Sequence, residues 1–382
     1  MQTKCPLMRA ERCFAGPKVM LFHASMKRMT FWPLHHIILK FRGIMMSKVT
    51  MQDIADAVGV SRVTVWKVFN NHDGVSSAVR EIVLDKAREL GYLKTNTEPL
   101  PKEPAKTVSL IVSRPDSSTF WTNIIHRMAQ ELSLHNVNLM YTYMPTKYAD
   151  DFTLPSVLTD GSVQGAVILN VYDDRLVSLI NDLELPKVFL DTTPSHSHHT
   201  LRGDLILLEG YSTIYQITES VIARGLTNIG FIGDTHYART NLDRFEGFRQ
   251  CMLTHDLQVD ECICLTRSIG IFSYYQEICD FLDSIDVLPQ AFVCASDYIA
   301  HFLRTYFTEH PERIPDGIMV TGYDASCEHT NIEEQITTAD VKTSILGKRL
   351  SVQVIYRMEH ADAPYELSYI YPSIIYRDSM LY

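Results

Sequence analysis

The stretch VTMQDIADAVGVSRVTVWKVF, residues 49–69, decides the fold of the N-terminal part of the chain. Thr50 and Asp53 have the spacing of a capping box, with the usual Glu shortened to Asp, so a helix is predicted to begin here. Residues 59–61 predict a tight turn, after which Ser61 can cap a second helix. The side chains expected on the inner faces recur at helical spacing: Met51, Ile54, Ala55, Val58, Val65, Val68 and Phe69.

A third helix is expected after the turn cluster at 70–74, beginning at Ser76 or Ser77 and ending before Gly91. Its buried face is predicted to carry Val79, Ile82, Val83 and Leu90. Two short helices joined through a glycine turn and followed by a supporting helix are typical of a helix-turn-helix unit, whose second helix enters the DNA major groove. A generic small bundle shows the same periodicity, so the pattern alone leaves both interpretations open.

The residues within this pattern resemble the DNA-binding headpiece of the lactose-repressor (LacI/GalR) family at 49–55, 59–65, 75–76 and 91–92. Arg62 and Val63 match the two base-reading positions. Arginine can donate two hydrogen bonds to guanine, while valine offers only apolar contact, for example to a thymine methyl group. Trp66 departs from the small residue that the family usually has. The positions that the resemblance implies as DNA contacts or their supports are Thr50, Ser61, Arg62, Val63, Thr64, Lys67, Asn70 and Ser76.

Charge is distributed unevenly along the 382 residues. The net charge of −10 is unexpected for a nucleic-acid-binding protein. However, residues 1–46 carry +7, residues 47–94 carry +1 and the rest of the chain carries −18. Hydrophobic residues make up 46% and charged residues 21%, which indicates a folded protein and excludes a mainly disordered or membrane-spanning one.

Two segments flank the predicted DNA-binding domain of residues 47–94. Residues 1–46 lack the apolar stretch and cleavage site of a signal peptide. We favour a start codon assigned too far upstream, before Met46, over a transit peptide, and expect no ordered domain here. Residues 95–106 hold three prolines, which oppose the hinge helix that the family places after its headpiece. We expect an extended tether, although Leu100 could still act as a minor-groove wedge.

Residues 107–382 alternate apolar strand-like runs with segments of helical length. This alternation predicts an α/β domain with parallel sheets, because parallel strands need long crossover connections. The predicted strands are 108–112, 137–141, 165–169, 187–190, 205–208, 228–232, 291–294 and 318–321. No glycine-rich phosphate loop or nucleophile elbow stands between a strand and a helix.

The same region resembles the two-lobed, type I periplasmic-binding-protein-like core of the family, in motifs such as 228–233, 244–248, 295–297 and 322–324. The resemblance implies a first lobe of about 107–208 and 338–367 and a second of about 209–337 and 368–382. It also implies an effector site in the cleft, at the carboxyl ends of the strands. The residues that match ligand-contacting positions are Phe120, Trp121, Asp191, Arg244 and Asp297. Glu209-Gly210 departs from the usual Asp-Asn.

The predicted protein is a cytoplasmic, ligand-responsive transcriptional regulator. We expect a homodimeric repressor of carbohydrate-utilisation genes that binds a pseudo-palindromic operator in double-stranded DNA and responds to a small sugar or sugar derivative. No cofactor, metal site, catalytic residue or membrane contact is predicted, and the eight cysteines are expected to be reduced. The alternatives are a solute-binding protein without a DNA role, which residues 50–91 disfavour, and an enzyme, for which no nucleophile–base pattern is present.

Overall fold

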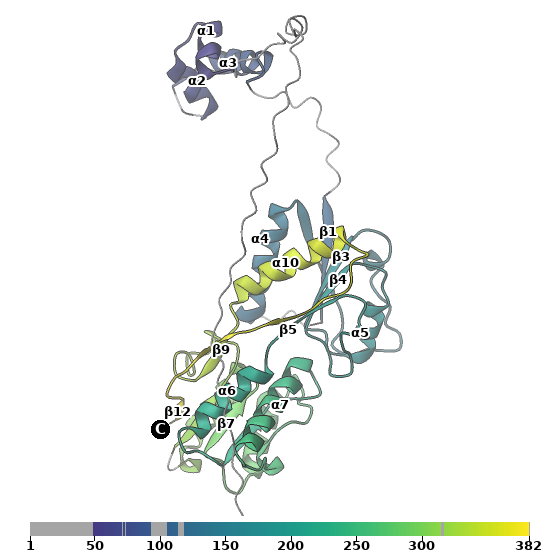
Figure 1. Cartoon of the computed structure of the whole chain (residues 1–382), viewed down its shortest axis with the longest axis vertical. Coiled ribbons are helices and arrows are strands. Elements are labelled where there is room, and N and C mark those ends of the chain that lie inside the picture. The colour runs from purple at the N-terminus through teal and green to yellow at the C-terminus, as the bar shows by residue number, and fades with distance from the viewer. Residues whose placement is uncertain are drawn as a thin grey trace, which may run out of the picture. The chain divides into compact units, whose positions relative to one another are not determined.

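The computed structural model describes residues 49–92 (except 71 and 73), 105–113, 118–314 and 317–381. They belong to two compact units, one within residues 1–100 and one within residues 101–382 (Figure 1). The predicted N-terminal extension of residues 1–46 and nearly all of the predicted linker, Leu100 included, lie outside the described residues.

The first unit consists of three helices, α1 (Met51–Val58), α2 (Arg62–Phe69) and α3 (Ser77–Glu89). Both hydrogen bonds of the predicted capping box are present, since Thr50 accepts from the Asp53 amide and the Asp53 carboxylate accepts from the Thr50 amide. Gly59 ends α1 with a φ of 75°, a left-handed conformation that glycine adopts without steric cost. Ser61 and Ser76 cap the next two helices. The predicted helix-turn-helix arrangement is confirmed.

The core of this unit is small and fully apolar. Its buried side chains are Ile54, Ala55, Val65, Val68, Val83 and Ala87. The prediction was wrong for Ile82, whose side chain is 55% exposed. Residue 82 lies about 100° around the helix from residue 83, so it points away from the face that buries Val83 and Ala87. The buried face of α3 therefore follows the i, i+4 spacing of Val83 and Ala87.

The second unit contains two lobes, each built on its own sheet. The first sheet has six parallel strands in the order β10-β5-β4-β3-β1-β2. Its strands are β1 (Lys106–Val112), β2 (Val137–Tyr143), β3 (Gly165–Leu169), β4 (Lys187–Leu190), β5 (Asp204–Leu208) and β10 (Leu367–Ile370). The first five strands lie where the sequence predicted them. β10 extends to Ile370, beyond the lobe boundary predicted at 367.

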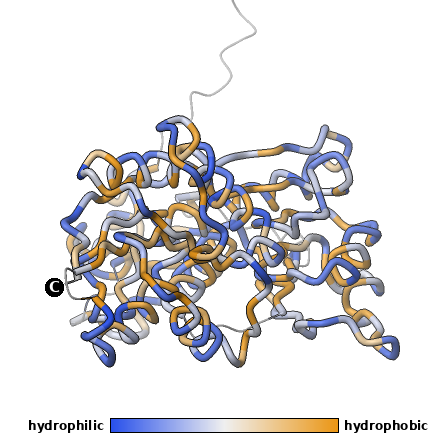
Figure 2. The backbone as a smooth tube through the Cα atoms, turned by 90° about the horizontal axis from the view of Figure 1, so that it is seen from below, coloured by the Kyte–Doolittle hydropathy of each residue, from blue (hydrophilic) through white to orange (hydrophobic). Residues whose placement is uncertain are grey.

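Strand residues of the first lobe alternate between two apolar layers. Val108, Leu110 and Val112 of β1 pack in one cluster with α4 (Thr119–Leu134) and α10 (Thr343–Glu359). Ile111 packs in the other cluster with α5 (Asp174–Asn181). Both faces of the sheet are thus covered, as parallel sheets require. Figure 2 shows the consequence along the chain, with hydrophobic segments running through the interior and hydrophilic ones at many outer turns.

The second lobe is built on a four-stranded sheet in the order β12-β8-β7-β6. Its strands are β6 (Ile229–Ile232), β7 (Ala291–Cys294), β8 (Ile318–Thr321) and β12 (Met380–Leu381), of which only β12 is antiparallel to its neighbour. Its helices are α6 (Tyr211–Ile222), α7 (Arg239–Thr254), α8 (Tyr274–Ser284) and α9 (Asp297–Glu309). In Figure 1 the lobes lie one above the other.

The chain passes between the lobes three times. It leaves the first sheet after β5, returns from β8 through β9 (Thr338–Asp340) to α10, and leaves again from β10 through β11 (Ser373–Ile375) to β12. β9 and β11 pair antiparallel in these connections. Three crossings place the carboxyl ends of the parallel strands of both sheets around one interlobe space. No helix within the described ranges has the length and apolar character needed to cross a membrane.

Candidate functional site

The exposed surface of α2 is the first candidate site. Arg62, Val63, Trp66 and Asn70 are exposed on one side of this helix, while Val65 and Val68 are buried on the other. Val63 is 62% exposed and Trp66 45%, so two apolar side chains face outward without packing in the core. An exposed helix face that carries a cation and apolar groups suits the major groove, where both hydrogen-bonding edges and thymine methyl groups are presented.

Most of the other predicted contact residues lie at helix ends. Thr50, Ser61 and Ser76 are the N-caps of α1, α2 and α3, and each side-chain oxygen accepts a hydrogen bond from an amide three residues on. Thr64 shares a 2.9 Å hydroxyl contact with Ser61. The first amides of such helices form a positive surface for phosphate. Lys67 is half-buried in the last turn of α2, and the Asn70 side chain donates to the carbonyl of Trp66.

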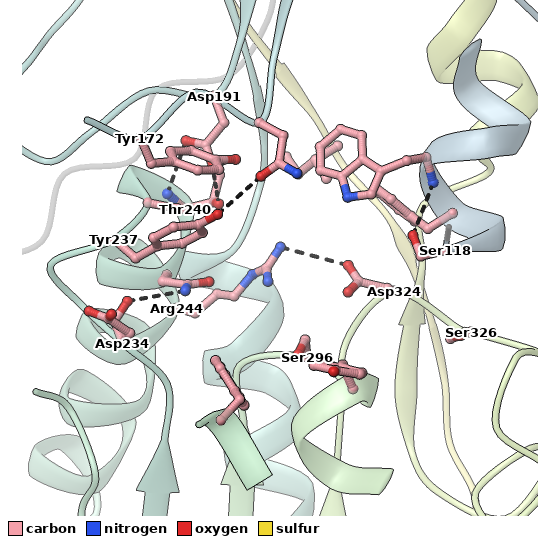
Figure 3. A pocket seen from close by; sticks show the side chains of 18 of the residues that line it. Ser118, Tyr172, Asp191, Asp234, Tyr237, Thr240, Arg244, Ser296, Asp324 and Ser326 are labelled. Atoms are coloured by element: carbon pink, nitrogen blue, oxygen red, sulfur yellow. Dashed lines mark hydrogen bonds and ion pairs between the residues drawn. The ribbon is translucent and has the colours of Figure 1, made fainter. Parts of the chain in front are cut away.

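The second candidate site is a cavity of about 330 Å³ between the lobes of the second unit (Figure 3). Its walls come from loops that follow β1, β3, β4 and β5 on one side and β6, β7 and β8 on the other. Of the five predicted effector-contacting residues, the structure places four in the lining, namely Phe120, Trp121, Asp191 and Arg244. The rings of Phe120 and Trp121 meet edge to face, with centroids 5.2 Å apart.

Asp191 joins the two lobes on one side of the cavity. Its carboxylate accepts hydrogen bonds from the Thr240 amide at 3.2 Å and from the Thr240 hydroxyl at 2.5 Å. Thr240 lies in the first turn of α7, so a residue of the first lobe caps a helix of the second. The hydroxyl of Tyr172 and the amide of Thr192 also donate to this carboxylate. Burial raises the pKa of Asp191, while the hydrogen bonds from Thr240 and Thr192 act in the opposite direction.

Further bonds cross between the lobes around the cavity. The hydroxyl of Tyr237 donates to the Asn170 side chain at 3.1 Å, and the Arg239 amide donates to the carbonyl of Thr192 at 2.7 Å. Beside Phe120, the Thr119 amide donates to the Glu328 carboxylate at 3.3 Å. Since Thr119 and Asp191 follow different strands of the first lobe, the lobes are connected at separate points. Hydrogen bonds therefore hold the two lobes together on more than one side of the cavity.

Arg244 forms the cationic centre of the cavity. Its guanidinium lies 3.6 Å from the ring centroid of Tyr323 and donates to the carbonyl of Ala295 at 2.6 Å. The Asp324 carboxylate is 3.9 Å away, and the buried Nε of Arg244 has no hydrogen-bond partner. Burial raises the pKa of Asp324 to about 6, and the nearby Arg244 opposes that rise. The pair can therefore both donate and accept hydrogen bonds at one ligand.

Asp297 lies elsewhere than the sequence predicted. It is 2% exposed and does not line the cavity, because it accepts from the Ser326 amide and the Thr338 hydroxyl behind the cavity wall. Asp324 instead faces Arg244. Asp297 thereby holds the loop that carries Asp324, Ser326 and Glu328. Burial, followed by the neighbouring Asp324, raises the pKa of Asp297 to about 7.

Glu209, which departs from the family pattern, also points away from the cavity. Its carboxylate accepts from the amides of Ser212 and Thr213 and so caps α6. The next residue, Gly210, allows α7 to approach closely, since a Cβ there would lie 2.6 Å from Cγ of Arg244. Glu209 and Gly210, which stand in place of the usual Asp-Asn, therefore support α6 and the placement of Arg244.

Sequence reasoning found two aromatic residues of the cavity, Phe120 and Trp121, but missed others. Four tyrosines that line it were not predicted: Tyr172, Tyr237, Tyr274 and Tyr298. Tyr172 and Tyr237 come from different lobes, yet their ring centroids are 4.4 Å apart. The motif 322–324 had been matched to the family, and its position after β8 could have indicated Asp324. The tyrosines offered no such local signal. No cluster of metal-binding side chains occurs in the part of the chain that the structure describes.

Comparison with known proteins agrees with both units. The model of the bacterial regulatory proteins of the lacI family matches residues 50–95, and that of the periplasmic binding protein-like domain matches residues 218–380. The chain is 25% identical over 346 residues to the HTH-type transcriptional regulator RegA of Clostridium saccharobutylicum, covering 87% of this chain and 99% of RegA.

Two solved structures show the same fold. One is the complex of the transcriptional regulator CelR with cellobiose, with a TM-score of 0.61, 21% identity and coverage of 87% of this chain and 99% of that one. The other is the Lac repressor dimer bound to operator and the anti-inducer ONPF, with a TM-score of 0.60, 19% identity and coverage of 88% and 100%.

A helix-turn-helix unit joined to a two-lobed α/β core with an interlobe cavity defines a class of DNA-binding transcriptional regulators. The chain thus combines a helix-turn-helix domain of the lacI family with a periplasmic binding protein-like domain, and it aligns with transcriptional regulators over nearly their whole length. The alternative of a solute-binding protein without a DNA role is thereby disfavoured.

Proposed function

We propose that this regulator is a cytoplasmic repressor that binds operator DNA as a homodimer and responds to a small sugar or sugar derivative in the interlobe cavity. The observation that carries the proposal is the pairing of an exposed recognition helix with an aromatic-lined interlobe cavity in the same chain. A ligand that favours one degree of lobe closure would shift the population of DNA-binding dimers.

The predicted DNA contacts divide into two chemical groups. Arg62 and Val63 are exposed at the start of α2, where they can reach base edges. The helix N-termini at Thr50, Ser61 and Ser76 present amides that suit phosphate. Thr64 supports the α2 cap, Lys67 adds a cation and Asn70 fixes the helix end. Arg62 would thus contribute sequence discrimination, and the caps would contribute orientation.

The cavity has the chemistry of a carbohydrate site. Phe120 and Trp121 offer aromatic faces and edges to the apolar faces of a sugar ring. Arg244 and Asp324 supply adjacent donors and acceptors for hydroxyl groups. Asp191 contributes by holding the lobes closed, because its oxygens already accept from Thr240, Thr192 and Tyr172. CelR, of the same fold, was solved with cellobiose, which supports a sugar as the class of effector.

The homodimer follows from DNA geometry and from the relatives. Two copies of the small α1–α3 unit would read the two halves of a pseudo-palindrome, and their linkage raises the affinity of each. The Lac repressor was solved as a dimer on its operator. Binding, and not turnover, is the proposed role of the cavity, since the relatives are transcriptional regulators.

DNA binding is tested by mobility shift with the full chain and DNA fragments from upstream of its own gene. We expect Arg62→Ala to weaken specific binding by about 10- to 100-fold, the loss expected for one bidentate base contact. Arg88→Ala is the matched control, because Arg88 pairs with Asp85 on α3 and is not in the proposed contact set. Equal losses in both variants, or no binding by the wild-type chain, would contradict the proposal.

Effector binding is tested by thermal shift with glucose, galactose, ribose and cellobiose, followed by calorimetric titration of any sugar that stabilises the chain. Trp121→Ala should weaken that binding by at least about tenfold, because a stacking face is lost. Phe272→Ala is the control, since this side chain is 97% exposed and does not line the cavity. A sugar affinity that survives Trp121→Ala would refute the assigned site.

A further inference from the structure

An exposed aromatic pair stands on the recognition surface and is not accounted for by the contact positions discussed above. Trp66 of α2 is 45% exposed, and its ring stacks on that of His72, with centroids 4.9 Å apart and planes inclined by 19°. His72 is itself exposed, so the pair forms a flat aromatic surface facing solvent. An exposed tryptophan is the kind of side chain that dominates binding surfaces.

The position of Trp66 on the helix places it among the base-reading residues. At about 100° per residue, Trp66 lies about 40° from Arg62 and about 60° from Val63, between the two around the helix axis. It is also about 6 Å further along the axis, since four residues separate it from Arg62. The Trp66 side chain therefore leaves the helix between the directions of Arg62 and Val63, the two predicted base-reading residues.

His72 is held in place by its backbone. Its amide donates to the carbonyl of Lys67 at 2.9 Å, and its own carbonyl accepts from the Arg80 guanidinium at 3.0 Å. Arg80 also donates to the carbonyl of Val68 at 3.2 Å, which ties α3 to the end of α2. These bonds fix the backbone of His72 at the end of α2, and the imidazole stacks on the indole from there. A side chain restrained before binding loses less conformational entropy in the complex.

We propose that Trp66, supported by His72, is a further specificity-determining residue that reads a thymine in each operator half-site. The C5 methyl group of thymine is the only methyl group among the four base edges of the major groove, and the indole has one polar atom and no charge. Phosphates are contacted by Arg and Lys, by hydroxyl and amide side chains and by N–H groups, so the largely apolar ring of the indole suits a methyl group better. This inference rests on the DNA-binding function and adds a second apolar reader beside Val63.

The test begins with the full wild-type chain and a library of random-sequence duplexes, from which bound DNA is selected and sequenced. Each thymine of the selected duplex is then replaced singly by deoxyuracil, which lacks only the methyl group. We expect one thymine in each half-site, apart from any read by Val63, where this replacement weakens binding by about fourfold, the value expected for one buried methyl group. In Trp66→Ala the same replacement should have no effect, while in Val63→Ala it should persist.

Four further variants make the result specific. Trp66→Phe should retain part of the thymine preference, and His72→Ala should reduce it because the indole is released, with recovery in His72→Phe. Ile82→Ala is the matched control, since it truncates an apolar side chain of α3 that is 55% exposed. It should bind as the wild type does, and circular dichroism should show all variants folded.

Two outcomes would overturn the proposal while leaving the DNA-binding function intact. One is a deoxyuracil profile that is identical in the wild type and Trp66→Ala. The other is a uniform loss of affinity for all duplexes in Trp66→Ala, which would indicate a contact to the sugar-phosphate backbone. A wild-type chain that enriches no sequence would instead overturn the DNA-binding function, and this proposal with it.

Discussion

The α1–α3 unit and the interlobe cavity assemble their functional residues in opposite ways. In the first unit, the proposed contacts lie between Thr50 and Ser76, are mostly exposed, and are positioned by caps three residues away. In the cavity, the lining extends from Ser118 to His329, and its acids and arginine are mostly buried. The difference teaches that an exposed DNA-contacting surface can be positioned by contacts between residues close in sequence. A buried site instead depends on how the two lobes, each built on its own sheet, are packed together.

The backbone shows the same contrast. Asp191 and Asp324 adopt φ values of 66° and 106°, a left-handed region that non-glycine residues rarely occupy. Such a conformation costs on the order of 1–3 kcal/mol and persists only where surrounding contacts hold it. Among the described residues of the first unit, positive φ is confined to glycines. In the second unit positive φ also occurs at non-glycine residues, and three of these, Asn170, Asp191 and Asp324, line the cavity.

The largest effect is expected for Asp191→Ala, which removes the acceptor shared by both lobes. The Thr240 hydroxyl, its amide and the Tyr172 hydroxyl would lose a buried partner, so the free energy of unfolding of the second unit should fall by about 4 kcal/mol. Differential scanning calorimetry would measure this. Asp191→Asn, which keeps one carbonyl oxygen, should lose about half as much. A loss below about 1 kcal/mol would show that the lobes close without this contact.

The next effect concerns pH and Asp297. Its pKa is raised from 3.8 to about 7 in the folded chain, so its contribution to stability is fully present below about pH 4 and is lost as the pH rises to about 7. Asp297→Asn, which stays neutral, should flatten the decline in stability of the second unit across this window, by about 4 kcal/mol. Thermal unfolding at several pH values would measure the difference. A profile parallel to that of the wild type would contradict this role.

Within the first unit, the comparison between Val83 and Ile82 tests how strongly the burial of a side chain affects stability. Val83→Ala should lower the free energy of unfolding of this unit by about 2 kcal/mol, because Val83 is fully buried. Ile82→Ala removes a larger side chain but should change stability by no more than about 0.5 kcal/mol, because Ile82 is 55% exposed. Chemical denaturation followed by circular dichroism gives both values. Equal losses would mean that α3 packs on a different face.

The smallest effect is expected for the α1 cap. Thr50→Ala removes the side-chain acceptor of the Asp53 amide and should cost about 1 kcal/mol of stability. Thr50→Ser keeps the hydroxyl, so the loss of stability should be only a few tenths of the loss in Thr50→Ala. The same denaturation experiment compares the two variants. If both lose the same amount, the methyl group and not the capping bond is responsible.

Much of the fold was accessible from the sequence, since its signals are local. The capping box at Thr50, the glycine turn at Gly59 and the apolar runs of the parallel strands each predicted the element observed. Ile82 was misplaced because a 3.6-residue period leaves neighbouring positions ambiguous in a short helix. Within the cavity, Phe120, Trp121, Asp191 and Arg244 were found through family resemblance and not through any pattern of spacing.

The sequence by itself thus determined the helix-turn-helix unit, the parallel α/β core and the exposure of the recognition helix. Only the tertiary structure decided that Asp191 joins the lobes, that Asp297 supports a loop and that Asp324 faces Arg244. The physical reason is the range of the interactions. Caps and helical faces arise within a few residues, whereas burial and pairing of charges depend on contacts between segments far apart in the chain.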